Sequence, residues 1–161
     1  MELLDTTKLT YKVGRKTKGL RAKPMVTLLV DRTVMAKFLV DTLEAKEPVH
    51  ADARFCIGES NDAWQQSAKK LLAKYTVDAI DSDGWMVCNP KQETSVEFCQ
   101  IPNTIISGGY IQGNWGETVE GLGANLQRYK PADFVVRNRE DHSDTWIVDR
   151  KIFLNSYTEI V

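Results

Sequence analysis

The chain has 161 residues, a formal net charge of −1, 42% apolar residues and 27% charged residues. This composition is typical of a folded globular domain and excludes a disordered chain. The longest apolar stretch, residues 25–30, is far shorter than the ~20 residues of a membrane-spanning helix, and the amino terminus lacks the pattern of a secretory signal. We therefore expect a single cytoplasmic domain over residues 1–161, with no membrane partner.

The first half of the chain, about residues 1–76, combines short strands with two helices. Apolar and β-branched runs predict strands, and apolar residues at three- and four-residue spacing predict helices. We expect strands at 9–13, 25–30 and 54–57, a helix from Asp31 or Thr33 to about Ala45, and a second helix over 62–75. A basic run from Lys12 to Lys23 carries six Lys or Arg residues and no acid.

The second half, about residues 77–161, is rich in β-structure. Runs at 77–80, 85–88 and 95–101 predict a three-stranded meander, and runs at 134–137 and 146–148 predict a last pair. Asp149 is placed to cap a short helix through Tyr157. The predicted fold class is α+β: a bent antiparallel sheet or small barrel with two main helices and a short C-terminal helix.

Two patterns connect the predicted strands. Cys88 and Cys99 lie on strands expected to be neighbours and could face one another, although the odd number of cysteines (with Cys56) favours reduced thiols. Residues 83–98 and 132–148 share an order of turn, strand, polar loop and return strand. This similarity indicates either a duplication or two ordinary hairpins.

The last thirty residues of the chain resemble a group of small phage and prophage proteins. The pattern runs from Pro131-Ala-Asp-Phe134 through Trp146-Ile-Val-Asp149 to Ile152-Phe153 and Ser156-Tyr-Thr-Glu159. It is similar to the C-terminal domain named for its Pro-Gly-Asp-Tyr-Gly motif, although Ala132 and Val135 stand where that motif has glycine. The resemblance implies a phage-type protein that acts in the host-cell cytoplasm, and it brings no catalytic residue with it.

The candidate binding site is the glycine-dense stretch from Gly108 to Gly123, which holds six of the ten glycines. Glycines allow close approach of the backbone, and a mixture of aromatic and polar side chains is typical of ligand pockets. The spacing matches neither a P-loop nor a dinucleotide fingerprint, and a connector whose glycines only make turns is the alternative. The predicted ligand-binding residues are Tyr110, Asn114, Trp115, Glu117 and, as the partner of an anion, Arg128.

The basic run is a weaker candidate, because dense positive charge is all that phosphate contact requires. Tyr11 is the one aromatic residue beside the run in the sequence, so stacking of bases lacks support and we do not expect nucleic acid as a partner. The residues concerned are Lys12, Arg15, Lys16, Lys18, Arg21 and Lys23.

Metal and nucleophile chemistry have little support in the sequence. Asp78, Asp81 and Asp83 could gather oxygens around a cation, but a tight Asp-Gly turn explains them as well. His50 and His142 lie in polar loops without a neighbouring nucleophile, and no zinc-type spacing occurs. We expect neither a metal site nor a cofactor.

The sequence therefore predicts a non-catalytic, phage-type binding module that recognises a host protein, as a host-defence antagonist would, or sequesters a small molecule such as a nucleotide. One alternative is a metal-dependent enzyme that acts on a nucleotide through Asp81, Asp83 or Glu117. A further alternative is a nucleic-acid accessory protein that uses the basic run. Exposed sheet edges also suggest a homodimer.

Overall fold

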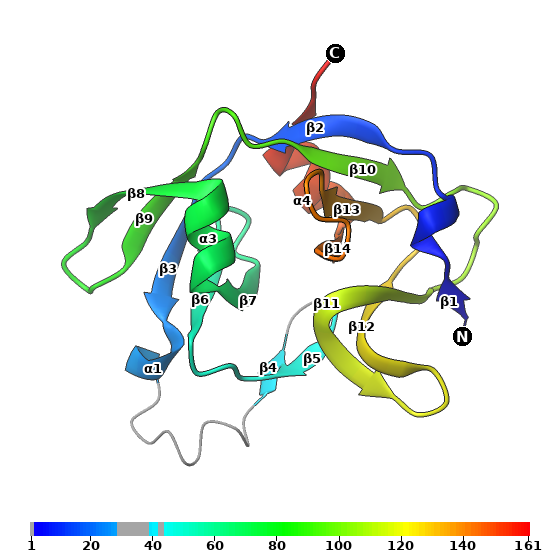
Figure 1. The fold of residues 1–161 in the computed structure, drawn as a ribbon, viewed down its shortest axis with the longest axis horizontal. Helices are drawn as coiled ribbons and strands as arrows, with labels where there is room; N and C mark the ends of the chain where they lie inside the picture. Colours follow the sequence, from blue (N-terminus) through cyan, green and yellow to red (C-terminus); the bar gives the residue numbers. More distant parts are fainter. Residues whose placement is uncertain (1, 29–38, 42–43) are drawn as a thin grey trace. The chain divides into compact units, whose positions relative to one another are not determined.

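The computed structural model describes residues 2–28, 39–41 and 44–161, and it is mostly β-structure, with 50% of residues in strands and 14% in helices. Figure 1 shows short helices and three main sheets. The prediction of an α+β fold with two main helices is therefore wrong. No described helix has the length and apolar character that membrane crossing requires.

The chain forms two compact units that alternate along the sequence. Unit 1 comprises Met1–Lys16, Leu43–Glu47 and Ser95–Val161, and unit 2 comprises Thr17–Thr42 and Pro48–Thr94. Each unit has its own five-stranded sheet and its own apolar core. The expectation of one domain over residues 1–161 stays a prediction.

Unit 1 contains two sheets. Sheet A has the strand order β1 (Leu3–Leu4), β11 (Gly109–Val119) and β12 (Gly123–Tyr129). Sheet B has the order β14 (Thr145–Val148), β13 (Phe134–Asn138), β10 (Val96–Gln100), β2 (Lys12–Lys16) and β15 (Tyr157–Glu159). The helical elements of unit 1 are a 3-10 turn, η1 (Thr6–Lys8), and helix α4 (Arg150–Ser156).

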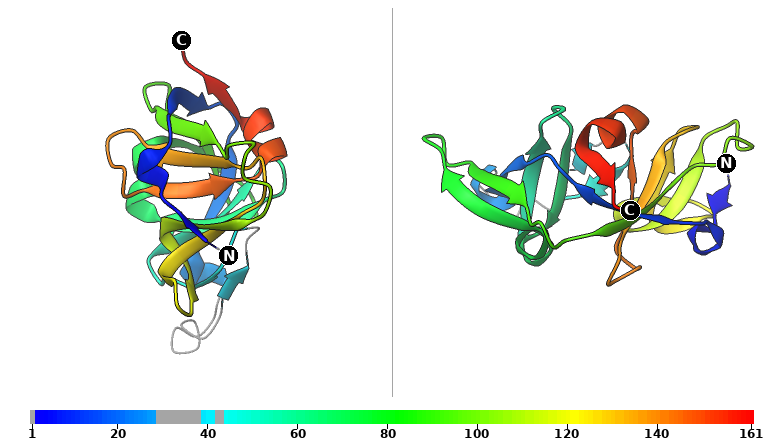
Figure 2. Two further views of the ribbon diagram at one scale, coloured as in Figure 1. Left: turned by 90° about the vertical axis from the view of Figure 1, so that its right-hand side faces the viewer. Right: turned by 90° about the horizontal axis from the view of Figure 1, so that it is seen from above.

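Aromatic rings join helix α4 to sheet B. Phe153 of α4 stacks on Phe134 of β13 with 3.9 Å between ring centroids, and Phe98 of β10 lies beside both rings. Both views of Figure 2 show α4 next to sheet B. Asp149 caps this helix as predicted, because its carboxylate accepts the N–H groups of Lys151 and Ile152.

Unit 2 is built on sheet C, a five-stranded antiparallel sheet. The strand order is β7 (Ala63–Ser67), β6 (Ala53–Gly58), β3 (Leu20–Pro24), β9 (Met86–Pro90) and β8 (Tyr75–Ile80). Its helices are α1 (Met25–Leu28) and α3 (Ala68–Lys74). The short strand β4 (Leu39–Asp41) also belongs to unit 2, whereas β5 (Lys46–Pro48) has its first two residues in unit 1 and its last in unit 2.

Alternation along the strands gives sheet C one buried face. Leu20 and Ala22 of β3 face the same side as Cys56 and Cys88, and Leu71 of α3 packs on this cluster.

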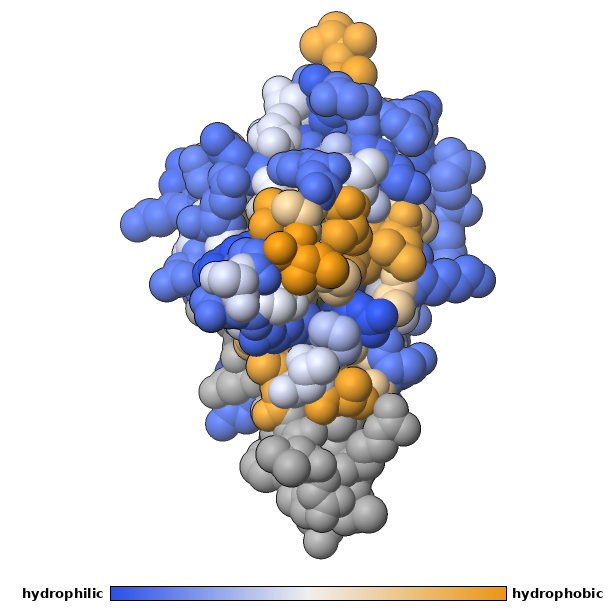
Figure 3. Space-filling model, turned by 90° about the vertical axis from the view of Figure 1, so that its left-hand side faces the viewer, coloured by the Kyte–Doolittle hydropathy of each residue, from blue (hydrophilic) through white to orange (hydrophobic). Residues whose placement is uncertain are grey.

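Figure 3 shows apolar side chains gathered in the middle of the face that it draws, with polar side chains around them. The exposed large apolar residues of unit 2 are Leu28, Leu72, Val77 and Ile80.

The predicted helices fail where strand pairing dominates. Residues 63–67, expected to be helical, pair along their whole length with β6, so helix α3 begins only at Ala68. Inter-strand hydrogen bonds outweigh local helical spacing there. Most of the helix expected between Asp31 and Ala45 lies outside the described residues, and Leu39–Asp41 within it is a strand. The strand expected from Met25 starts instead as the single turn α1.

The second half of the chain contains the predicted strands, but not as the predicted meander, and it adds three strands that were not predicted: β11, β12 and β15. Strands β8 and β9 form a hairpin in sheet C, whereas β10 belongs to sheet B and pairs with β13 and β2. Cys88 and Cys99 therefore lie in different sheets. Residues 134–148 form the hairpin β13–β14, but residues 83–98 do not form a matching hairpin.

Candidate functional site

The predicted binding stretch folds into the hairpin β11–β12, whose strong bend is visible in Figure 1. Gln112 and Glu117 both pair with Leu126, so the four residues 113–116 form a large bulge in β11. Two glutamines hold the bulge in place: Gln127 Nε2 donates to the Trp115 carbonyl at 2.8 Å, and Gln112 Nε2 donates to the Ala124 carbonyl at 2.9 Å.

Two glycines are required by the close packing of this bulge. A Cβ at Gly116 would clash with the backbone of Leu126. A Cβ at Gly113 would lie 2.9 Å from Gln127 Nε2 and 3.2 Å from the Thr145 carbonyl oxygen. Gly116 therefore permits close approach of the β12 backbone, and Gly113 leaves room for the Gln127 side chain and the Thr145 carbonyl.

A pocket of about 580 Å³ opens beside the bulge. Its polar lining consists mainly of amide and hydroxyl side chains, and among the described residues none forms a hydrogen bond with the side chain of Asn114. The pocket is formed by three parts of unit 1: the N-terminal residues 3–7, residues 112–114 of β11 with Asn125 of β12, and residues 142–145 at the start of β14. The lining residues are Leu3, Leu4, Asp5, Thr6, Thr7, Gln112, Gly113, Asn114, Asn125, His142, Ser143 and Thr145.

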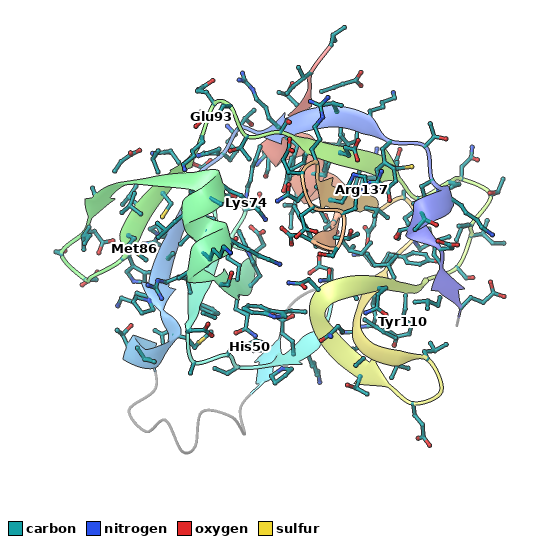
Figure 4. All side chains as sticks on the ribbon, viewed as in Figure 1. His50, Lys74, Met86, Glu93, Tyr110 and Arg137 are labelled. Atoms are coloured by element: carbon teal, nitrogen blue, oxygen red, sulfur yellow. The ribbon has the colours of Figure 1, made fainter. Side chains whose placement is uncertain are left out.

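Three other predicted ligand residues form a separate cluster. Tyr110, labelled in Figure 4, is paired across the hairpin with Arg128, and Arg128 Nε lies 3.4 Å from Glu117 Oε1. The second carboxylate oxygen of Glu117 accepts the backbone N–H of Lys46, and the backbone N–H of Arg128 donates to the Glu44 carbonyl at 2.7 Å. These bonds fasten residues 44–46 to the hairpin, so an anion at Arg128 would have to compete with Glu117.

The structure thus divides the predicted site. Asn114 lines the pocket, and Trp115 lies in the bulge, where its carbonyl is bound by Gln127. The pocket lining also includes residues that were not predicted from the sequence, above all Thr6 and Thr145. No local pattern could have revealed them, because parallel pairing of β1 with β11 brings the amino-terminal segment to the bulge.

A charged cluster lies on sheet B at one side of the pocket. Glu97 Oε1 lies 2.8 Å from Arg137 Nε and 2.9 Å from Nε2 of His142, a pocket residue. The Arg137 guanidinium also lies over the Tyr11 ring, 3.7 Å from its centroid. Partial burial raises the pKa of Tyr11, although the charge of Arg137 opposes this shift. The cluster fixes the His142 side chain at the pocket rim.

The basic run is divided between the two units. In unit 1, Lys12 pairs with Glu159 at 3.6 Å and the Lys16 ammonium lies 6.0 Å from the Tyr157 ring centroid. In unit 2, Arg21 and Lys23 of β3 lie over the Trp85 ring. Arg15 is on β2, and Lys18 is exposed between β2 and β3.

The acidic residues proposed for a cation form a turn instead. Asp81 Oδ1 accepts the N–H groups of Asp83 and Trp85 at 2.9 and 3.0 Å, which is the hydrogen bonding of an Asp-led turn. Asp81 and Asp83 belong to unit 2, whereas Glu117 belongs to unit 1. Within the described part of the chain, no group of three or more His, Cys, Asp or Glu residues could hold a metal ion.

The C-terminal motif makes a structural corner. Asp133, 2% exposed, accepts the N–H of Lys130 at 2.9 Å and that of Arg150 at 3.3 Å. Ala132 has φ +71°, the left-handed conformation that glycine adopts most easily. Comparisons of the chain with models of protein families, with curated proteins and with solved structures give no match. The phage-type resemblance stays a prediction.

Proposed function

We propose that unit 1 is a non-catalytic binding module that holds a small, uncharged polar molecule in the pocket beside the β11 bulge. The observation that carries this proposal is the bulge itself. Four residues of β11 have no partner in β12, and Asn114 among them presents an amide to the pocket without another described hydrogen-bond partner. A volume of about 580 Å³ lies within the range of small-molecule sites.

The lining indicates the chemistry of the ligand. The described lining residues include no Lys or Arg, and the carboxylate of Asp5 already accepts the N–H and hydroxyl of Thr7. Amides and hydroxyls both donate and accept, so they suit a ligand with several hydroxyl or amide groups. A nucleoside or a sugar fits this lining better than a free nucleotide, whose phosphates call for positive charge.

The test is native mass spectrometry of the full-length protein as purified, followed by thermal shift against a panel of nucleosides, mono- and disaccharides. We expect a retained small mass, or a panel member that raises the melting temperature, and we expect Asn114→Ala to abolish either signal. The matched control is Asn103→Ala, which changes an exposed asparagine of unit 1 outside the pocket. Equal ligand signals in the two variants would show that the pocket is not the site.

The wider setting in this proposal comes from the C-terminal motif alone. A phage-type protein would use such a module inside the host cell to withhold a small signalling or metabolic molecule. Recognition of a host protein and formation of a homodimer stay predictions that the same native spectra would test, since each adds a protein-sized mass.

A further inference from the structure

Strand β3 presents two cations side by side on one face of sheet C. Arg21 and Lys23 are two residues apart in the strand, so their side chains leave the same face, opposite to the face that buries Leu20 and Ala22. Arg21 is exposed and Lys23 is half-buried. The guanidinium of Arg21 lies 5.6 Å and the ammonium of Lys23 4.9 Å from the centroid of the Trp85 ring.

Trp85 is held firmly at this face by the turn before β9. The backbone N–H of Trp85 donates to Asp81 Oδ1 at 3.0 Å, and its carbonyl accepts the Asp81 N–H at 2.9 Å. Phe55 of β6 lies against the indole, with 6.5 Å between ring centroids. Cation–π contacts with this ring therefore order the side chains of Arg21 and Lys23.

Among the residues that the structure describes, the two cations have no ion-pair partner. Within residues 2–28, 39–41 and 44–161, no carboxylate oxygen lies within 4.0 Å of a side-chain nitrogen of Arg21 or Lys23. Arg21 is flanked across the sheet by Ile57 and Val87, both half-buried. The face thus combines two ordered positive charges with aromatic and aliphatic surface.

We propose that this face of unit 2, defined by Arg21, Lys23, Trp85 and Phe55, binds single-stranded nucleic acid. Such strands present phosphates at regular intervals and unpaired bases with apolar faces. The two cations would contact phosphates, and the aromatic and aliphatic side chains beside them would contact bases. The surface is independent of the unit 1 pocket, so either proposal can fail alone.

The test measures binding of a fluorescein-labelled 20-nucleotide oligothymidine to the full-length protein by fluorescence anisotropy. Two phosphate contacts predict that affinity falls about sevenfold between 50 and 200 mM salt. We expect R21Q/K23Q to weaken binding about tenfold or more and to remove most of the salt dependence. Trp85→Leu keeps the charge but removes the aromatic support, and it should weaken binding about fivefold.

The matched control is K69Q/K74Q, which removes the same charge from α3, the helix that packs on the opposite face of sheet C. Its affinity should stay within a factor of about two of the wild type. The proposal is overturned if the wild-type protein does not bind at 50 mM salt, if the two double variants lose affinity equally, or if a 20-base-pair duplex binds as tightly as the single strand.

Discussion

The two units of this chain use their charged residues in different ways. In unit 1, hairpins and loops are fastened by ion pairs: Glu117 with Arg128, and Glu97 with Arg137. In unit 2, the cations of β3 lie on the Trp85 ring without a described carboxylate partner. Arg128 and Arg137 of unit 1 thus have carboxylate partners, whereas Arg21 and Lys23 of unit 2 lie on an aromatic ring and have no carboxylate partner among the described residues.

This difference is the basis of the two ligands proposed above for the two units. Arg128 of unit 1 forms an ion pair with Glu117, and the described pocket lining contains no Lys or Arg, which supports the uncharged polar ligand proposed above. A cation that lies on an aromatic ring keeps its N–H groups available for an external acceptor, because the face of the ring has no lone pair that would accept a hydrogen bond. Arg21 and Lys23 therefore suit phosphate.

The largest effect is expected from Gly116→Ala in the bulge of unit 1. The added Cβ would clash with the Leu126 backbone, which cannot move without breaking the β11–β12 pairing. We expect the free energy of unfolding to fall by about 2–3 kcal/mol, measured by urea denaturation. Binding at the pocket should also be lost, while binding of oligothymidine at unit 2 should persist.

Gly121→Ala is the control for this prediction. Gly121 has φ +83°, but no atom lies within 4 Å of an added Cβ. Only the cost of the left-handed conformation applies, about 1 kcal/mol. Equal destabilisation by the two substitutions would mean that the bulge is not closely packed, and the pocket assignment would lose its basis.

A smaller effect on the free energy of unfolding is expected from substitution of Asp149, a residue of unit 1 that both caps helix α4 and forms an ion pair. Its carboxylate accepts two N–H groups of α4 and lies 3.2 Å from Lys130 Nζ. Partial burial opposes ionisation, but the hydrogen bonds from Lys130, Ile152 and Lys151 lower the pKa of Asp149. Asp149→Ala should cost about 1 kcal/mol at neutral pH, mainly through the lost cap, measured by urea denaturation.

The pH dependence gives this prediction its sign. A carboxyl group whose pKa is lower in the folded state stabilises the fold above its unfolded pKa, about 4, and the stabilisation is lost as the pH falls through the folded value. The difference between wild type and Asp149→Ala should therefore shrink at acid pH. Asp149→Asn keeps a good cap and should lose only a few tenths of a kcal/mol, because Lys130 is exposed. A loss as large as that of alanine would show that the ion pair dominates.

Local signals in the sequence predicted some of the short strands and the C-terminal helix, but they missed β3, β7 and the hairpin β11–β12. The Asp149 cap and strands β6, β13 and β14 follow from alternation, turn residues and capping chemistry, which act over a few residues. The helix prediction for residues 63–67 is wrong because these residues pair with β6, which forms hydrogen bonds with their backbone in the extended conformation. Helical spacing of Trp64 and Ala68 could not reveal that competition.

The candidate sites show the same limit. Glycine density and polar composition located Asn114, but Thr6 and Thr145 reach the pocket only through the pairing of distant strands. The basic run offered Tyr11 as its only nearby aromatic residue in the sequence. Antiparallel pairing of β3 with β9 brings Trp85, more than sixty residues later in the sequence, to Arg21 and Lys23. Contacts of this range depend on topology, which one sequence does not reveal.

The smallest expected effect is that of Arg21→Gln on stability, and it tests the comparison between the units directly. An exposed cation on an aromatic ring contributes about 0.5 kcal/mol, so the substitution should barely change urea unfolding while it weakens oligothymidine binding. Arg137→Gln is the matched change in unit 1, where the side chain is 15% exposed and bonded to Glu97 at 2.8 Å. Loss of a hydrogen bond between charged groups predicts about 1.5–3 kcal/mol there. If Arg21→Gln cost as much as Arg137→Gln, the β3 cations would be structural, and their availability to phosphate would be refuted.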